Sequence, residues 1–96
     1  LDISHSFLAA KYLKIDFYHL LSKFAPFAAH YHIADATDPN GEGLQIGHGD
    51  INFIKVLDII KNLSPEASFI PEVWQGHKNN GSGFELALQR LSEYGW

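Results

Sequence analysis

The stretch His30-Tyr31-His32-Ile33-Ala34-Asp35 decides the fold, because it reads as a short strand that ends in side chains able to bind a metal ion. Two other segments have the same character, Leu1-Asp2-Ile3-Ser4-His5 and Phe69-Ile70-Pro71-Glu72-Val73-Trp74. The spacing between the three segments is about the length of a strand–helix–strand unit. The sequence therefore predicts strands that run parallel and are joined by helical crossovers.

Asp2, His32 and Glu72 occupy matching places in these segments. Ligands carried at the carboxyl ends of successive parallel strands converge on one edge of the sheet. Divalent ions such as manganese, magnesium, cobalt and zinc accept mixed carboxylate and imidazole ligands. We therefore expect these three side chains to form a metal site.

Turn and helix signals separate the expected strands. Strands are predicted at Leu1–Ser4, Ala28–Ala34 and Ser68–Val73, and a polar, glycine-rich loop at Asp35–Gly49. Apolar residues at helical spacing predict a short helical turn over Ser6–Leu13 and three helices, one capped by Asp16, one capped by Asp50 and a last one that begins at a capping box of Ser82 and Glu85. The alternation indicates an α/β fold with helices packed outside a parallel sheet.

Composition limits the functional classes. The 96 residues make at most one small domain, and their 46% hydrophobic content describes a chain that buries a core. Cysteine is absent, which excludes thiolate chemistry. No apolar run approaches the roughly 20 residues that cross a bilayer, and the net charge of −4 comes without a basic patch. We expect a cytoplasmic protein that binds neither nucleic acid nor membrane.

The chain begins at Leu1, where the first expected strand is already under way. We therefore expect residues 1–96 to be the C-terminal piece of a longer polypeptide, or a processed or truncated chain. Three parallel strands alone would leave two open edges and one poorly covered face, which favours part of a closed barrel.

An ordered set of motifs resembles the xylose isomerase-like sugar isomerase/epimerase superfamily. Asp2-Ile3-Ser4-His5 resembles its sixth strand, and His32-Ile33-Ala34-Asp35 its seventh. Gly41–Ile51 is similar to the glycine-rich loop before its seventh helix, and Phe69-Ile70-Pro71-Glu72 to its eighth strand. The resemblance implies that residues 1–96 are a partial domain, the last three strand–helix units of a (β/α)8 TIM barrel with parallel strands and helices outside.

The resemblance also implies a metal-dependent isomerase or epimerase of sugars or sugar phosphates. Asp2, His32 and Glu72 would be three of four ligands to one divalent ion, and the fourth, a glutamate, would precede Leu1. Glu72 and that glutamate would exchange a proton with the carbon beside the carbonyl of a ketose, through an enediolate. Residues 1–96 alone would then be inactive, and would form a homo-oligomer or associate with the missing N-terminal part.

Substrate contacts follow from the same resemblance. His5, close to Asp2, would donate a hydrogen bond to a substrate oxygen. Trp74 and His77 would line the pocket, as would the loop residue His48, although these three match no fixed motif of the superfamily.

Each residue also has a structural alternative. Asp2 is a natural capping residue, and Trp74 a natural packing residue at a barrel mouth. Either histidine of the His30–His32 pair fits an interior, hydrogen-bonded role, and His30 fits it better. Glu72 in an apolar strand calls for a metal or for a cation such as Lys78. The remaining polar residues fit structural positions, with Asp35 as a capping or outer-sphere residue, Glu42 in a solvated turn and His19 on the surface.

Two other functional classes remain open. Type IV endonucleases belong to the same superfamily and use three zinc ions, but they carry an Asp-x-His pair in the loop after the seventh strand. Here His48 is preceded two places earlier by Ile46, and the chain lacks a basic groove for a phosphate backbone. The second alternative is a non-catalytic barrel segment attached to another sugar-biosynthesis enzyme domain, with a vestigial metal site.

Overall fold

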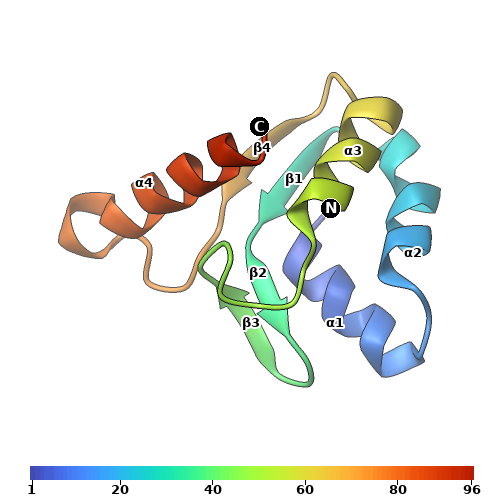
Figure 1. Cartoon of the computed structure of the whole chain (residues 1–96), viewed down its shortest axis with the longest axis horizontal. Helices are drawn as coiled ribbons and strands as arrows, with labels where there is room; N and C mark the ends of the chain where they lie inside the picture. The colour runs from blue at the N-terminus through green and yellow to red at the C-terminus, as the bar shows by residue number, and fades with distance from the viewer.

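The computed structural model describes all residues from Leu1 to Trp96, and its centre is a parallel sheet (Figure 1). Strands β1 (His30–Ile33) and β4 (Ser68–Pro71) pair in parallel, with Tyr31 opposite Phe69. On the other side of β1, Asp2 forms a single parallel bridge with His32. Three chain segments therefore run parallel, in the expected order, and the fold is of the α/β class.

The first strand is much shorter than expected, because helix α1 (Ile3–Leu13) begins where the strand was predicted to continue. Asp2 has extended backbone angles, φ −96° and ψ 120°, and its side chain accepts a hydrogen bond from the His5 amide. This contact is an N-cap, which satisfies one of the free amides of the first turn. The predicted strand over Leu1–Ser4 is therefore wrong beyond Asp2, whereas the predicted helical turn over Ser6–Leu13 is confirmed as part of α1, which begins at Ile3.

Helices cover one face of the parallel sheet. The second helix, α2 (Phe17–Phe24), continues into a 3-10 turn, η1 (Ala25–Phe27), and α3 (Phe53–Leu63) and α4 (Lys78–Glu93) follow the hairpin and β4. Burial alternates along β1, where Tyr31 and Ile33 are fully buried. All four helices contribute to one core cluster with these two residues. The opposite face, which carries His30 and His32, is not covered in this way.

The Asp35–Gly49 segment is not the irregular loop that its composition predicts. It contains an antiparallel hairpin of β2 (Asp35–Thr37) and β3 (Gly41–Leu44) (Figure 1). Pro39 and Asn40 lie in the turn between the two strands, where such residues are favoured. The hairpin departs from the sheet directly after β1, so β3 lies next to α1.

Two predicted helix caps are wrong and one is right. Asp16 caps α2 as expected, but α3 is capped by Asn52, whose side chain accepts from the Lys55 amide at 3.2 Å. Asp50 instead accepts a hydrogen bond from the Thr37 hydroxyl. The start of α4 is interrupted by left-handed backbone at residues 79–81, and the Ser82 hydroxyl donates to the Lys78 carbonyl, which replaces the expected capping box.

Three barrel strands on their own are expected to expose apolar side chains such as Ile3, Tyr31, Ile33, Phe69 and Ile70, but three of these five residues are fully buried. Ile3, Tyr31 and Ile33 have no exposed surface, since they lie under the helices, whereas Ile70 is 46% exposed on the open face. The outer edge of β4 is blunted by Pro71, which has no amide hydrogen to offer a further strand. No helix of the protein is long and apolar enough to span a membrane.

Candidate metal centre

Asp2, His32 and Glu72 come together at the carboxyl end of the parallel segments, as their spacing predicts. One possible ligand atom from each residue lies within 4.8 Å of the other two. Atoms bound to one ion at about 2.0 to 2.3 Å lie roughly 3 to 4.5 Å from one another. Two carboxylates and an imidazole are suitable ligands for a divalent ion, and small side-chain movements would bring atoms within 4.8 Å of one another to these separations.

The register of the sheet positions His32 and Glu72. His32 is paired with Ile70, and Glu72 follows β4 with its amide hydrogen-bonded to the Ile33 carbonyl. His32 Nδ1 then lies 3.0 Å from Glu72 Oε2. The Glu72 side chain is 52% exposed, so it is less buried than the apolar sequence around it indicates, and its partner is His32 and not Lys78.

His30 has the structural role that its position predicts. Its Nδ1 atom lies 2.7 Å from the Ser68 hydroxyl, across the β1–β4 pairing, and its ring packs edge-on against that of His32 at 5.3 Å between centroids. His30 thus supports the His32 ring while His32 faces Glu72. The surface position expected for His19 is also observed.

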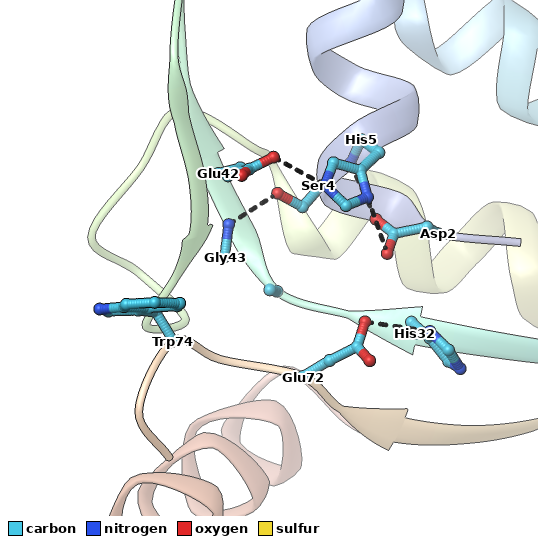
Figure 2. A pocket seen from close by; sticks show the side chains of 9 residues that line it. Asp2, Ser4, His5, His32, Glu42, Gly43, Glu72 and Trp74 are labelled. Carbon is cyan, nitrogen blue, oxygen red and sulfur yellow. Dashed lines mark hydrogen bonds and ion pairs between the residues drawn. The ribbon is translucent and has the colours of Figure 1, made fainter.

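His5 joins the metal cluster to the hairpin. Its Nδ1 lies 3.2 Å from Asp2 Oδ2, and its Nε2 lies 2.7 Å from Glu42 Oε2 (Figure 2). The hydrogen bond to Glu42 and the negative charge of Asp2 raise the pKa of His5 above the ordinary histidine value. Asp2 therefore lies between two groups, with His5 on one side and the His32–Glu72 pair on the other (Figure 2).

These side chains line a hollow of about 190 Å³. Trp74, which is 79% exposed, forms part of its wall and is not packed in the core of residues 1–96. The complete lining is Asp2, Ser4, His5, His32, Ala34, Glu42, Gly43, Glu72 and Trp74. His77 and His48 do not belong to it; His77 precedes α4 and His48 lines a separate depression with Arg90.

Asp35 organises the protein behind the hollow and does not line it. It is fully buried, and its two carboxylate oxygens accept hydrogen bonds from four backbone amides between 2.8 and 3.1 Å. The donors are Ala36, Gly47, Gly49 and Ile51. A buried carboxylate is stable when its lone pairs are matched by donors in this way. Asp35 thus fixes the loop between β3 and α3.

Glu42, Ser4 and Gly43 are site residues that the sequence interpretation misses. The sequence predicts a solvated turn at Glu42, but this residue lies on β3 and faces α1 across the hollow. In the sequence, Glu42 is marked only by its position between two glycines, Gly41 and Gly43. This pattern fits a loop as well as a strand that approaches another backbone closely, so it does not identify Glu42 as a site residue.

Comparison with known proteins adds no relative: the chain matches no protein-family model, no curated protein and no solved structure.

Proposed function

We propose that this chain is part of a divalent-metal-dependent sugar or sugar-phosphate isomerase or epimerase. The observation that carries the proposal is the convergence of Asp2, His32 and Glu72 beside the exposed ring of Trp74. The motif resemblance adds the (β/α)8 barrel, in which residues 1–96 would be the last three strand–helix units. It also places a fourth ligand, a glutamate, on a strand that precedes Leu1.

Asp2, His32 and Glu72 would hold the ion through one atom each. When bound, the ion would favour negative charge on the sugar oxygens as a proton leaves the neighbouring carbon. A donor set of two carboxylates and one imidazole is suited to manganese, cobalt or zinc and, with water, to magnesium. The 3.0 Å separation of His32 Nδ1 and Glu72 Oε2 is compatible with a shared ion as well as with a direct ion pair.

Glu72 is the proposed acid/base group. Its Oε2 atom lies beside His32, while Oε1 makes no hydrogen bond within the protein and is free to take a proton from substrate carbon and return it. A carboxylate in this role must reach the proton that it transfers, and its half-exposed position at the hollow allows this. Trp74 offers an aromatic face to the apolar side of a sugar ring.

The lining of the hollow favours a sugar over a nucleic-acid backbone. Asp2, Glu42 and Glu72 bring three carboxylates, and no lysine or arginine lines the hollow. A nucleic-acid backbone carries a phosphate at every nucleotide and is bound by several cationic side chains, which this hollow does not supply, whereas a sugar phosphate carries its phosphate at one end only. This supports the isomerase proposal over the endonuclease alternative.

The test is deuterium exchange from solvent into a panel of ketoses and aldoses, followed by NMR, with added Mn²⁺ and with EDTA. The assay uses the longest natural polypeptide that contains residues 1–96, because the proposal requires a further glutamate. We expect metal-dependent exchange that Glu72→Gln abolishes and that the exposed control Glu66→Gln retains. Metal-dependent exchange that persists in Glu72→Gln removes Glu72 from the acid/base role. Metal binding without exchange on any sugar favours the non-catalytic alternative.

A further inference from the structure

Glu42 and His5 meet across the hollow from two elements that are distant in the sequence. Their side chains are 62% and 63% exposed, yet Glu42 Oε2 and His5 Nε2 lie only 2.7 Å apart. Holding two exposed side chains in one geometry costs side-chain entropy, and backbones that are already fixed relative to each other reduce this cost. The hairpin provides this constraint.

The backbone next to Glu42 is hydrogen-bonded on both sides. The Gly43 amide donates to the Ser4 hydroxyl at 3.0 Å, and the Gly43 carbonyl accepts from the Trp74 amide at 2.7 Å. Gly43 has a φ angle of 65°, which a glycine adopts without strain. These bonds hold β3 between the start of α1 and the end of β4, so the Glu42 side chain points toward His5 (Figure 2).

Both ring nitrogens of His5 are in contact with carboxylates in this arrangement, Nδ1 with Asp2 and Nε2 with Glu42. Asp2 also caps α1 and lies in the metal cluster. Glu42 has no other hydrogen-bond partner among the protein side chains. The Glu42 contact is therefore the one that a substrate group can replace without disturbing the helix or the metal ligands.

We propose that Glu42 is a positioning residue for His5, and that the Glu42–His5 pair recognises a hydroxyl group of the substrate. The part of this proposal that concerns the substrate rests on the proposed function. A hydroxyl both donates and accepts hydrogen bonds, so it can enter between the two side chains, donate to Glu42 and accept from His5 Nε2. A sugar that lacks this hydroxyl cannot make both contacts.

The experiment compares Glu42→Ala and Glu42→Gln with the matched control Glu66→Ala, which removes an exposed carboxylate elsewhere. The first measurement is the order of the His5 ring in the metal-free protein, from carbon-13 NMR relaxation. We expect a rigid ring in the wild type, a mobile ring in Glu42→Ala, and largely restored order in Glu42→Gln, whose amide oxygen still accepts a hydrogen bond. The control should match the wild type.

The second measurement is binding of Mn²⁺ alone, followed by steady-state kinetics on the sugar that the exchange assay identifies. Glu42→Ala should leave the affinity for Mn²⁺ within about twofold of the wild type, because Glu42 is not in the ligand cluster. It should raise KM for the sugar by about tenfold or more, the usual loss for a hydrogen bond to a charged group. For an analogue of the sugar that lacks this hydroxyl, Glu42→Ala and the wild type should have nearly the same affinity.

Three results would overturn the proposal. A His5 ring that is equally ordered in Glu42→Ala and the wild type would show that Glu42 does not position it. Loss of Mn²⁺ binding in Glu42→Ala but not in Glu66→Ala would make Glu42 part of the metal site. An unchanged KM would remove the hydroxyl contact. A wild-type protein that binds no Mn²⁺ would instead overturn the proposed function, and the ring order would still decide whether Glu42 positions His5.

Discussion

His32 Nδ1 lies 3.0 Å from Glu72 Oε2, although His32 belongs to β1 and Glu72 comes directly after β4. The contact follows from the parallel register, in which His32 is opposite Ile70 and Glu72 follows two residues later. The separation fits a hydrogen-bonded ion pair, and it fits equally two ligands on one ion about 2.1 Å from each. Metal affinity therefore distinguishes these interpretations better than the geometry of the pair does.

The first prediction is that His32 and Glu72 both contribute to metal binding. Replacing a ligand removes a direct bond to the ion. His32→Ala and Glu72→Gln should therefore each weaken Mn²⁺ binding by at least roughly tenfold, because even the loss of a residue that only supports a ligand usually has an effect of this size. Electron paramagnetic resonance of free Mn²⁺ during titration measures this affinity. Glu66→Gln is the control. Equal affinity for Mn²⁺ in all three variants and in the wild type would mean that His32 and Glu72 form an ion pair and do not bind a metal ion.

The convergence of the three candidate ligands is predictable from the sequence, whereas the contact between His5 and Glu42 is not. Asp2, His32 and Glu72 follow apolar segments, and parallel pairing alone brings such positions to one edge. Glu42 reaches His5 only because β3 is hydrogen-bonded to Ser4 and Trp74, and these bonds exist only in the folded chain. No local pattern encodes them.

Two predictions, a strand over Leu1–Ser4 and an irregular loop over Asp35–Gly49, are wrong because contacts in the folded chain decide the structure there. Leu1–Ser4 has strand-forming residues, but the Asp2 cap starts α1 immediately after a single bridge. The composition after Asp35 predicts an irregular loop, but the amides of Gly47, Gly49 and Ile51 all donate to the one buried carboxylate of Asp35. A local cap decides the first case, and long-range contacts override local propensity in the second.

The second prediction concerns the titration of His5 in the metal-free protein. Glu42 and Asp2 raise its pKa, so the NMR midpoint of the His5 ring should lie above the ordinary value of about 6.5. Glu42→Gln should lower this midpoint, since the hydrogen bond to Glu42 is the largest cause of the shift.

The sign of the effect on stability follows from the raised pKa. The folded protein favours protonated His5. The stabilisation of the fold by protonated His5 is therefore complete below the ordinary histidine pKa, and it is lost as the pH rises through the raised pKa of His5. Urea unfolding measures the free energy of unfolding at several pH values. As the pH rises from the ordinary histidine pKa through the raised pKa of His5, this free energy should fall less in Glu42→Gln than in the wild type. A midpoint that does not respond to Glu42→Gln would contradict the hydrogen bond.

The third prediction is that Asp35 is a stability residue. Asp35→Ala would leave four amide donors near a buried position without their acceptor, which should lower the free energy of unfolding by roughly 3 kcal/mol or more. Asp35→Asn should also destabilise the fold, because its NH₂ group would face two amide donors. Urea unfolding measures both. The exposed control Asp58→Asn should change stability by no more than about 0.5 kcal/mol.

The last prediction tests whether Ser4 fastens the hairpin to α1. The Ser4 hydroxyl is buried, donates to the Asp35 carbonyl at 3.2 Å and accepts from the Gly43 amide at 3.0 Å. Ser4→Ala removes both bonds, so it should lower the free energy of unfolding by about 1 to 3 kcal/mol. Ser6→Ala is the matched control on the same helix, because the Ser6 hydroxyl makes no hydrogen bond in the protein, and its effect should stay within about 0.5 kcal/mol.

Ser4→Ala also has a consequence for the site. Without the bond to Gly43, β3 should move more freely, and the His5 ring should lose order even though Glu42 is intact. Carbon-13 relaxation of His5 in folded Ser4→Ala, compared with Ser6→Ala, measures this loss. A destabilised protein with an unchanged His5 ring would mean that the Trp74 bond alone holds Glu42 in place, and that Ser4 acts only on stability.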